Sequence, residues 1–167
     1  MKKLIFISQF ISAGILSLVS VAAIATPPQT NDRATYNVIL KDARTTQVST
    51  LEKKIEALDE KSQTVKIVET ETLAGHKPRV TNSEIVLEDV QAEYSVFSEC
   101  GDYGGNYEKI LVPAGLLEVC GIPLNNEEEV GKAWYGLVPF GLVKKEVKLF
   151  GTNVLETTEL QSFQQGR

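Results

Sequence analysis

The sequence has few of the residues on which catalysis and metal binding most often depend. Its 167 residues include one histidine, two cysteines, one methionine and one tryptophan. The single histidine, His76, lies in a Gly-His-Lys-Pro segment that is typical of an exposed turn. A structural zinc site uses about four ligands, and His76 is the only histidine that could join the two cysteines. We therefore expect neither histidine-based catalysis nor a zinc site.

The motifs of common enzyme classes are also missing. The chain has no Gly-x-Ser-x-Gly elbow, no phosphate-binding loop and no glycine pattern for a dinucleotide. Acidic residues are abundant, but no spacing pairs two of them as glycosidases require. These absences predict no cofactor and favour a non-enzymatic protein, with a carboxylate-dependent hydrolase as a remaining alternative.

Positive charge is scarce. The formal net charge is −5, with no basic cluster, so the chain would repel the phosphate backbone of a nucleic acid. Calcium would need several oxygen ligands at once. Asp102, Asn106 and Glu108 offer oxygens, as does the run Glu127-Glu128-Glu129, but their spacing matches no EF-hand loop. We predict no metal site, and the acidic run leaves calcium binding open.

Only one long apolar run is present, and it begins close to the N-terminus. Lys2 and Lys3 precede the run Leu4 to Val21, which ends before Ala23-Ile24-Ala25, a small-x-small cleavage site. Residues 1–25 are therefore predicted to be a signal peptide for export to the periplasm or beyond, and an uncleaved membrane anchor is the alternative. Cleavage would remove two lysines and no acid, changing the net charge from −5 to −7.

The rest of the chain is predicted to form one domain without a membrane span. Residues 26–34 (TPPQTNDRA) are polar and lack periodicity, which indicates a flexible leader. Residues 35–167 are enough for a single hydrophobic core.

The two cysteines are predicted to form a disulfide bond. Cys100 and Cys120 would meet an oxidising compartment after export, and their spacing differs from a redox Cys-x-x-Cys motif. By the chain-entropy estimate, closing this loop would contribute about 3 kcal/mol to stability. The bridge is therefore expected to be structural.

A helical pattern is predicted early in the domain. Val48, Leu51, Ile55 and Leu58 are spaced by three, four and three residues, and Ser49 with Glu52 fits a capping box. We expect one N-terminal amphipathic helix here, packed on a sheet.

From residue 64 onward the pattern has a period of two, which predicts strands. One of them is predicted over residues 90–100, with Val90, Ala92, Tyr94, Val96 and Cys100 on its buried face. Two LVPxGL segments, 111–117 and 137–143, are predicted hairpin turns, and a duplicated two-strand unit is the alternative. The fold class is therefore α+β, mainly β: an antiparallel meander or small barrel-like sheet with one helix.

Two segments are candidate binding surfaces. Asp102, Tyr103, Asn106 and Tyr107 lie in a Tyr/Gly-rich loop inside the predicted disulfide ring, a composition that recognition loops use. A second segment is rich in large apolar residues, which form either core or a contact patch. Its candidates are Trp134, Tyr135 and Phe140.

These features favour an exported, non-enzymatic binding module, such as an inhibitor or an envelope accessory protein, that takes a protein partner. The alternative is a carrier of a small ligand or lipid, in which the sheet encloses an apolar pocket near Trp134.

Overall fold

The computed structural model describes residues 27–166, so the predicted signal peptide lies outside the described residues. Within them the chain forms nine strands and one helix. In chain order these are β1 (Arg33–Lys41), β2 (Thr46–Asp59), β3 (Thr64–Leu73), β4 (Arg79–Val86), α1 (Leu87–Ser95), β5 (Asn106–Val112), β6 (Gly115–Asn125), β7 (Glu129–Gly136), β8 (Leu142–Leu149) and β9 (Leu155–Gln164).

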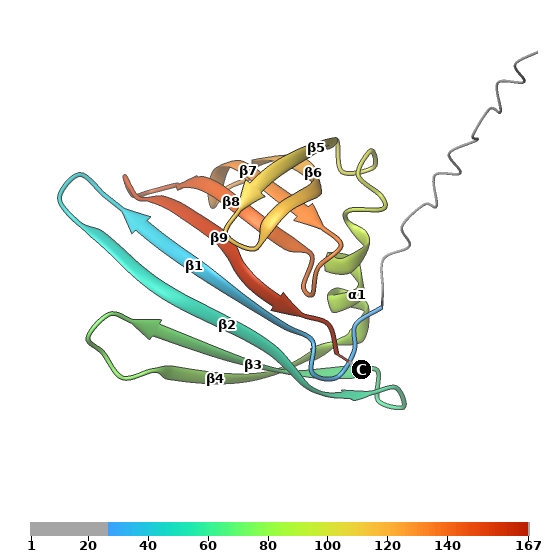
Figure 1. The fold of residues 1–167 in the computed structure, drawn as a ribbon. Helices are drawn as coiled ribbons and strands as arrows, with labels where there is room; N and C mark the ends of the chain where they lie inside the picture. The colour runs from blue at the N-terminus through green and yellow to red at the C-terminus, as the bar shows by residue number, and fades with distance from the viewer. Residues whose placement is uncertain (1–26, 167) are drawn as a thin grey trace, which may run out of the picture.

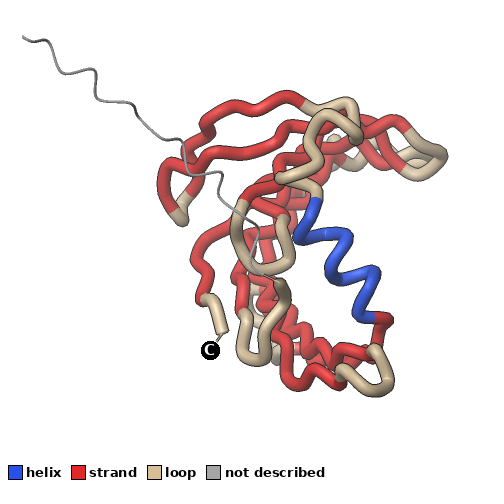
Figure 2. Tube along the Cα trace, turned by 90° about the vertical axis from the view of Figure 1, so that its right-hand side faces the viewer, coloured by secondary structure: helices blue, strands red, loops and turns tan. Residues whose placement is uncertain are grey.

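All nine strands belong to one antiparallel sheet, in the order β4-β3-β2-β1-β9-β8-β7-β6-β5 (Figure 1). The first and last strands pair at its centre, and β4 and β5 form its two edges. The sheet curves strongly, and α1 spans the open side of the curve (Figure 2). The connection from β4 through α1 to β5 therefore crosses from one edge of the sheet to the other.

The predicted class, mainly β with one helix, is confirmed in its coarse form. The position of the helix was wrong: α1 follows β4 rather than preceding the sheet. The sheet is also open, because β4 and β5 do not pair with each other.

The segment predicted to be a helix, 48–58, is the strand β2, paired with β1 on one side and β3 on the other. Leu51 and Ile55 are four residues apart, so they share a face in a strand as well as in a helix. A bulge between Ile55 and Ala57 then shifts the alternation, while Val48 lies on the opposite face and is exposed. The spacing of apolar residues in this bulged strand therefore matched the spacing expected of an amphipathic helix.

The opposite error occurred at residues 90–100, where the predicted strand is α1 and the turns after it. The buried residues of α1 are Leu87, Val90 and Tyr94, spaced by three and four. Ala92, which a strand would have buried, is exposed. Glu88 and Asp89 in the first turn favour a helix because they interact well with its dipole.

Both LVPxGL segments form hairpin turns, as predicted. The first joins β5 to β6, and the second joins β7 to β8. In the second turn Phe140 and Gly141 both have positive φ, 62° and 66°. A Cβ at Gly141 would lie 2.3 Å from the carbonyl oxygen of Glu93 in α1, so glycine lets the helix approach the turn closely.

The main core lies between α1 and the sheet. The ring of Tyr94 packs against Phe140, with centroids 6.3 Å apart. Buried aliphatic and aromatic side chains from both halves of the sheet complete this core: Tyr36, Ile55, Val65, Val119, Val143 and Leu160.

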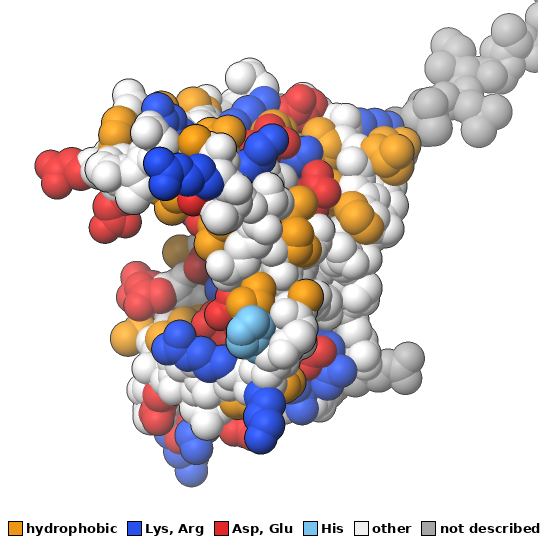
Figure 3. All heavy atoms as spheres, turned by 90° about the vertical axis from the view of Figure 1, so that its left-hand side faces the viewer, with side chains coloured by type: hydrophobic (Ala, Val, Ile, Leu, Met, Phe, Trp, Pro, Cys, Tyr) orange, Lys and Arg blue, Asp and Glu red, His pale blue; other side chains and the backbone are white. Residues whose placement is uncertain are grey.

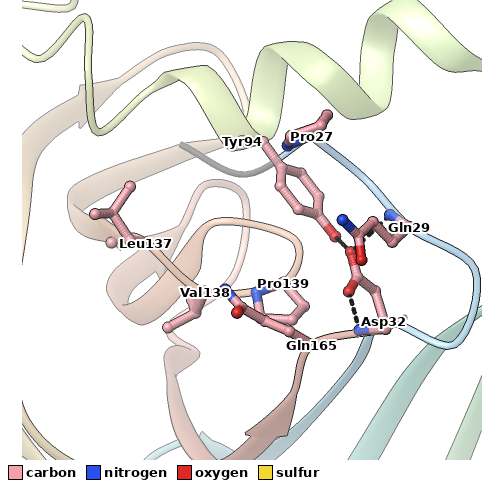
Figure 4. Close-up of a pocket in the computed structure, with 10 residues that line it drawn as sticks. Pro27, Gln29, Asp32, Tyr94, Leu137, Val138, Pro139 and Gln165 are labelled. Carbon is pink, nitrogen blue, oxygen red and sulfur yellow. Dashed lines mark hydrogen bonds between the residues drawn. The ribbon is translucent and has the colours of Figure 1, made fainter. Parts of the chain in front are cut away.

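The buried carboxylate of Asp32 joins both ends of the domain to the helix (Figure 4). Its Oδ2 accepts hydrogen bonds from the hydroxyl of Tyr94 (2.7 Å) and the backbone N–H of Gln29 (2.9 Å). Its Oδ1 accepts one from the N–H of Gly166 (2.7 Å). Strand β1 begins at Arg33, so regular structure starts inside residues 26–34, the segment predicted to be a flexible leader.

We predict that Asp32→Asn lowers the free energy of unfolding by about 3 kcal/mol, because one buried donor and two part-buried donors lose a charged acceptor. Tyr94→Phe, which removes one of these bonds, should cost about 1–2 kcal/mol. Urea unfolding followed by circular dichroism measures both. Asp102→Asn, at an exposed loop position, is the control, and equal stabilities for the Asp32 and Asp102 variants would contradict this role.

Candidate functional site

The segment after α1 is fixed to the sheet by the predicted disulfide bond. Cys100 is bonded to Cys120 of β6, with Cα atoms 5.6 Å apart, and both residues are buried. A second, smaller core surrounds the bridge, formed by Val96 and Ile122 with Phe97 and Tyr135 packed against it. The predicted disulfide bond between Cys100 and Cys120 is confirmed, and Cys100 is buried as predicted.

Gly105 closes the loop directly against this bridge. Its N–H donates to the carbonyl of Cys100 (2.9 Å). A Cβ at this position would lie 2.5 Å from Sγ of Cys120 and 2.9 Å from Sγ of Cys100. Only glycine fits here without a shift of the disulfide.

The four predicted loop residues lie together at this end of the molecule. Tyr107 meets the ring of Phe97 edge-on at 5.3 Å, and its hydroxyl donates to the carbonyl of Phe97 (2.8 Å). Tyr107 nevertheless remains 55% exposed, and Tyr103 is 43% exposed. Asp102 and Asn106 are exposed as well. The loop is therefore anchored by a tyrosine that still presents much of its surface to solvent.

The β5–β6 hairpin has two different faces, since residues opposite each other in an antiparallel pair share a face. On one face, Val112 belongs to the main core, and Ile110 packs against it. Alternation places Tyr107, Lys109 and Leu111 on the other face.

All three of these residues are exposed, and Leu111 is 77% exposed. In β6, Leu116 pairs with Leu111 and is 67% exposed. We call the residues Tyr103, Tyr107, Lys109, Leu111 and Leu116 the hairpin surface.

Trp134 lies away from these tyrosines, on the opposite face of the sheet. Its indole N–H donates to Oε1 of Glu108 (2.8 Å), and Nζ of Lys132 and of Lys144 lie 5.0 and 5.8 Å from its ring centroid. Hydrogen bonds from Lys132, and then from Trp134, hold the pKa of Glu108 below its ordinary value. Charged groups thus border the Trp134 ring, which also packs against the main core.

The other two predicted residues differ in accessibility. Tyr135 is half-buried beside the disulfide and shares a face with Tyr107, and burial raises the pKa of its hydroxyl. Phe140 is only 2% exposed and lies in the main core. A partner therefore cannot reach the Phe140 side chain in this structure.

Leu111 and Leu116 were not predicted to be surface residues from the sequence. Both lie in the LVPxGL segment predicted to form a hairpin turn, and two large apolar residues on each side of a turn are equally typical of core. The alternation of Tyr107, Lys109 and Leu111 was the signal that could have identified the exposed face.

The concave face of the sheet offers a second surface, visible as a hollow in Figure 3. Within it, five side chains line a cavity of about 230 Å³: Leu51, Glu69, Glu71, Arg79 and Thr81. Lys53 pairs with Glu69 (3.1 Å), and Ser49 donates to Glu71 (3.2 Å). Much of the charge in this hollow is therefore already satisfied within the protein.

A smaller cavity of about 100 Å³ lies where the two ends of the domain meet α1, and its lining includes Asp32, Tyr94 and Pro139 (Figure 4). Ligand pockets usually enclose about 300 Å³ or more. Trp134 does not line this cavity.

No group of three or more histidine, cysteine or acidic side chains converges as a metal site within residues 27–166. In the same residues, no helix is both long enough and apolar enough to cross a membrane.

Glu93 of α1 and Tyr36 of β1 influence each other electrostatically. The Tyr36 hydroxyl is buried and has no hydrogen-bond partner among the described residues, and burial raises its pKa. Loss of water around the Glu93 carboxyl group raises its pKa above the ordinary value of 4.5, an effect that the positive charge of Lys53 only partly offsets. The negative charge of Glu93 further raises the pKa of Tyr36.

Comparison with protein-family models and with curated proteins found no match. Among solved structures, the chain resembles one from Bacteroides fragilis that is described as a candidate exported protein with a YmcC-like fold. The TM-score is 0.52 at 13% identity, over 83% of this chain and 98% of that one. This likeness concerns the fold alone.

More distant similarity is found to MucB, with a TM-score of 0.45 at 8% identity, and to the Pseudomonas aeruginosa MucA/MucB complex, with a TM-score of 0.43 at 9% identity. The chain covers 55% and 53% of these structures, and they cover 84% of it. TM-scores below 0.5 carry no inference about function.

We predict that Gly105→Ala lowers the free energy of unfolding by about 1–3 kcal/mol, because the added methyl group overpacks the disulfide. Gly101→Ala is the matched control, since a Cβ there meets nothing within 4 Å. Chemical denaturation under non-reducing conditions compares the two. Equal stabilities would show that the loop does not rest on the bridge.

We also predict that Glu93→Gln raises the melting temperature at pH 8. A carboxyl group with a raised folded-state pKa destabilises the fold once it is ionised. Below about pH 4 it is protonated in both states and the gain should vanish. Glu56→Gln, at an exposed position of β2, is the control. A gain that persists unchanged at low pH would contradict the assigned cause.

Proposed function

We propose that the chain is an exported, non-enzymatic binding protein whose hairpin surface contacts a protein partner. Export rests on the predicted signal peptide, and the Cys100–Cys120 bridge is consistent with an oxidising compartment. Partner binding rests on the hairpin surface itself.

The observation that carries the proposal is the direct pairing of two highly exposed leucines on a rigid support. Leu111 and Leu116 lie opposite each other and show larger exposed fractions than the other exposed large hydrophobic residues of the described chain. On the same face of β5, Tyr107 lies nearer the loop, separated from the two leucines by Lys109. Contiguous exposed apolar groups with tyrosine and a charged residue are typical of protein interfaces.

The support is rigid for three reasons. The opposite face of β5 is anchored in the main core through Val112, the loop is joined to β6 by the disulfide, and the backbone of Ala114 at the turn donates to Leu160 of β9 (3.2 Å). A preorganised surface loses little conformational entropy on binding. The same framework therefore supports both stability and recognition.

The carrier hypothesis has less support. It required an apolar pocket near Trp134, but that ring packs against the main core and is bordered by Glu108, Lys132 and Lys144, and it lines none of three cavities found among the described residues.

The proposal predicts that Leu111→Ser/Leu116→Ser lowers recovery of a specific partner at least about tenfold, the loss expected when an interface centre is removed. The tagged full chain is expressed in its own host, and partners are captured from the compartment in which it accumulates.

Val48→Ser/Val130→Ser is the matched control, because both valines are exposed but lie away from the hairpin surface. Each variant is first shown to keep the wild-type melting temperature. Recovery that is unchanged in the leucine variant, or lost equally in the valine variant, would contradict the proposal.

A further inference from the structure

The strand that carries the hairpin surface is also an edge of the sheet. Among the described residues, β5 pairs with β6 on one side, and the order of strands ends there. Its seven residues contain no proline, and its register with β6 is continuous from Asn106 to Val112. Alternate backbone N–H and C=O groups along the other side of β5 are therefore available for pairing.

Natural edge strands are usually protected against such pairing by prolines, bulges or charged residues. In β5 this protection is weak, because the exposed face has one charge, Lys109, between two large side chains, Tyr107 and Leu111. The opposite edge, β4, also exposes Val80 and Val86, but they are separated by a polar, exposed stretch from Thr81 to Glu84. The β5 edge is thus open, and its outward face carries two large side chains with one charge between them.

The chemistry that suits this edge can be read from β6, which already pairs with the other side of β5. Leu116 lies opposite Leu111, and Glu118 lies opposite Lys109. Lys109 is exposed, and within residues 27–166 no carboxylate forms an ion pair with it. Its positive charge therefore remains available to an acidic residue on the free side.

We propose, building on the function proposed above, that the protein partner adds a strand of its own to the free edge of β5. The added strand carries an acidic residue opposite Lys109. Apolar residues two positions away on each side lie opposite Leu111 and Tyr107. Main-chain hydrogen bonds supply the pairing, and the alternate side chains supply its specificity.

A capped heptapeptide with this pattern, Thr-Leu-Thr-Glu-Thr-Val-Thr, is the probe, titrated into the oxidised protein and followed by backbone amide NMR. We expect saturable shifts in β5 with slowed exchange of its outward amides, and no such change in β4. Replacing the glutamate of the peptide by lysine should weaken binding about tenfold. The protein variant Lys109→Glu should reverse this preference.

A second peptide separates strand addition from contact between side chains alone. N-methylation of the amides that would face β5 removes the main-chain donors and should abolish binding. Equal binding of the methylated peptide, an unchanged preference in Lys109→Glu, or no binding at millimolar peptide would overturn the inference.

The outcomes also distinguish this inference from the proposed function. If capture of the partner depends on Leu111 and Leu116 while the peptide tests fail, the hairpin surface binds by side chains alone. If capture does not depend on these leucines, the proposed function itself fails.

Discussion

The packing of α1 across the open side of the curved sheet is the constraint on which the rest of the structure depends. One short helix joins the two halves of a nine-strand sheet, and Tyr94 is its anchor. Its ring packs on Phe140, and its hydroxyl reaches Asp32, which also holds the segments before β1 and after β9. Because Gly141 has no side chain, the helix can approach closely enough for these contacts.

The position of the helix determines the position of the hairpin surface. The chain leaves α1 beside β6, where the disulfide from Cys100 to Cys120 fixes it, and Gly105 then allows it to pass the bridge into β5. Strand β5 consequently becomes an edge, with one face anchored in the core and Tyr107, Lys109 and Leu111 exposed on the other. The stability of the fold and the exposure of this surface have the same origin.

The sequence predicted the disulfide, the two hairpin turns and a mainly antiparallel sheet, because each depends on local chemistry or on a period of two. It placed the helix wrongly, because residues four apart share a face in both a strand and a helix. The spacing of Leu51 and Ile55 also suits a helix, although both lie in the bulged strand β2. The spacing of Val90 and Tyr94 also suits a strand, although both lie in α1. The role of Asp32 in joining the ends of the domain to the helix could not be predicted, since two of its three partners lie 62 and 134 residues away. For the candidate site, the sequence indicated that the loop tyrosines could be exposed, but it could not separate the buried Phe140 from the exposed Leu111.

The central claim is that the hairpin surface is where this protein meets its partner. Site-specific photo-crosslinking in the native compartment tests it most directly, with the crosslinking residue placed at Leu111, at Leu116 or at Val48. The account predicts one discrete crosslinked protein, shared by positions 111 and 116 and missing at position 48. The same product at all three positions, or a product at position 48 alone, would contradict it.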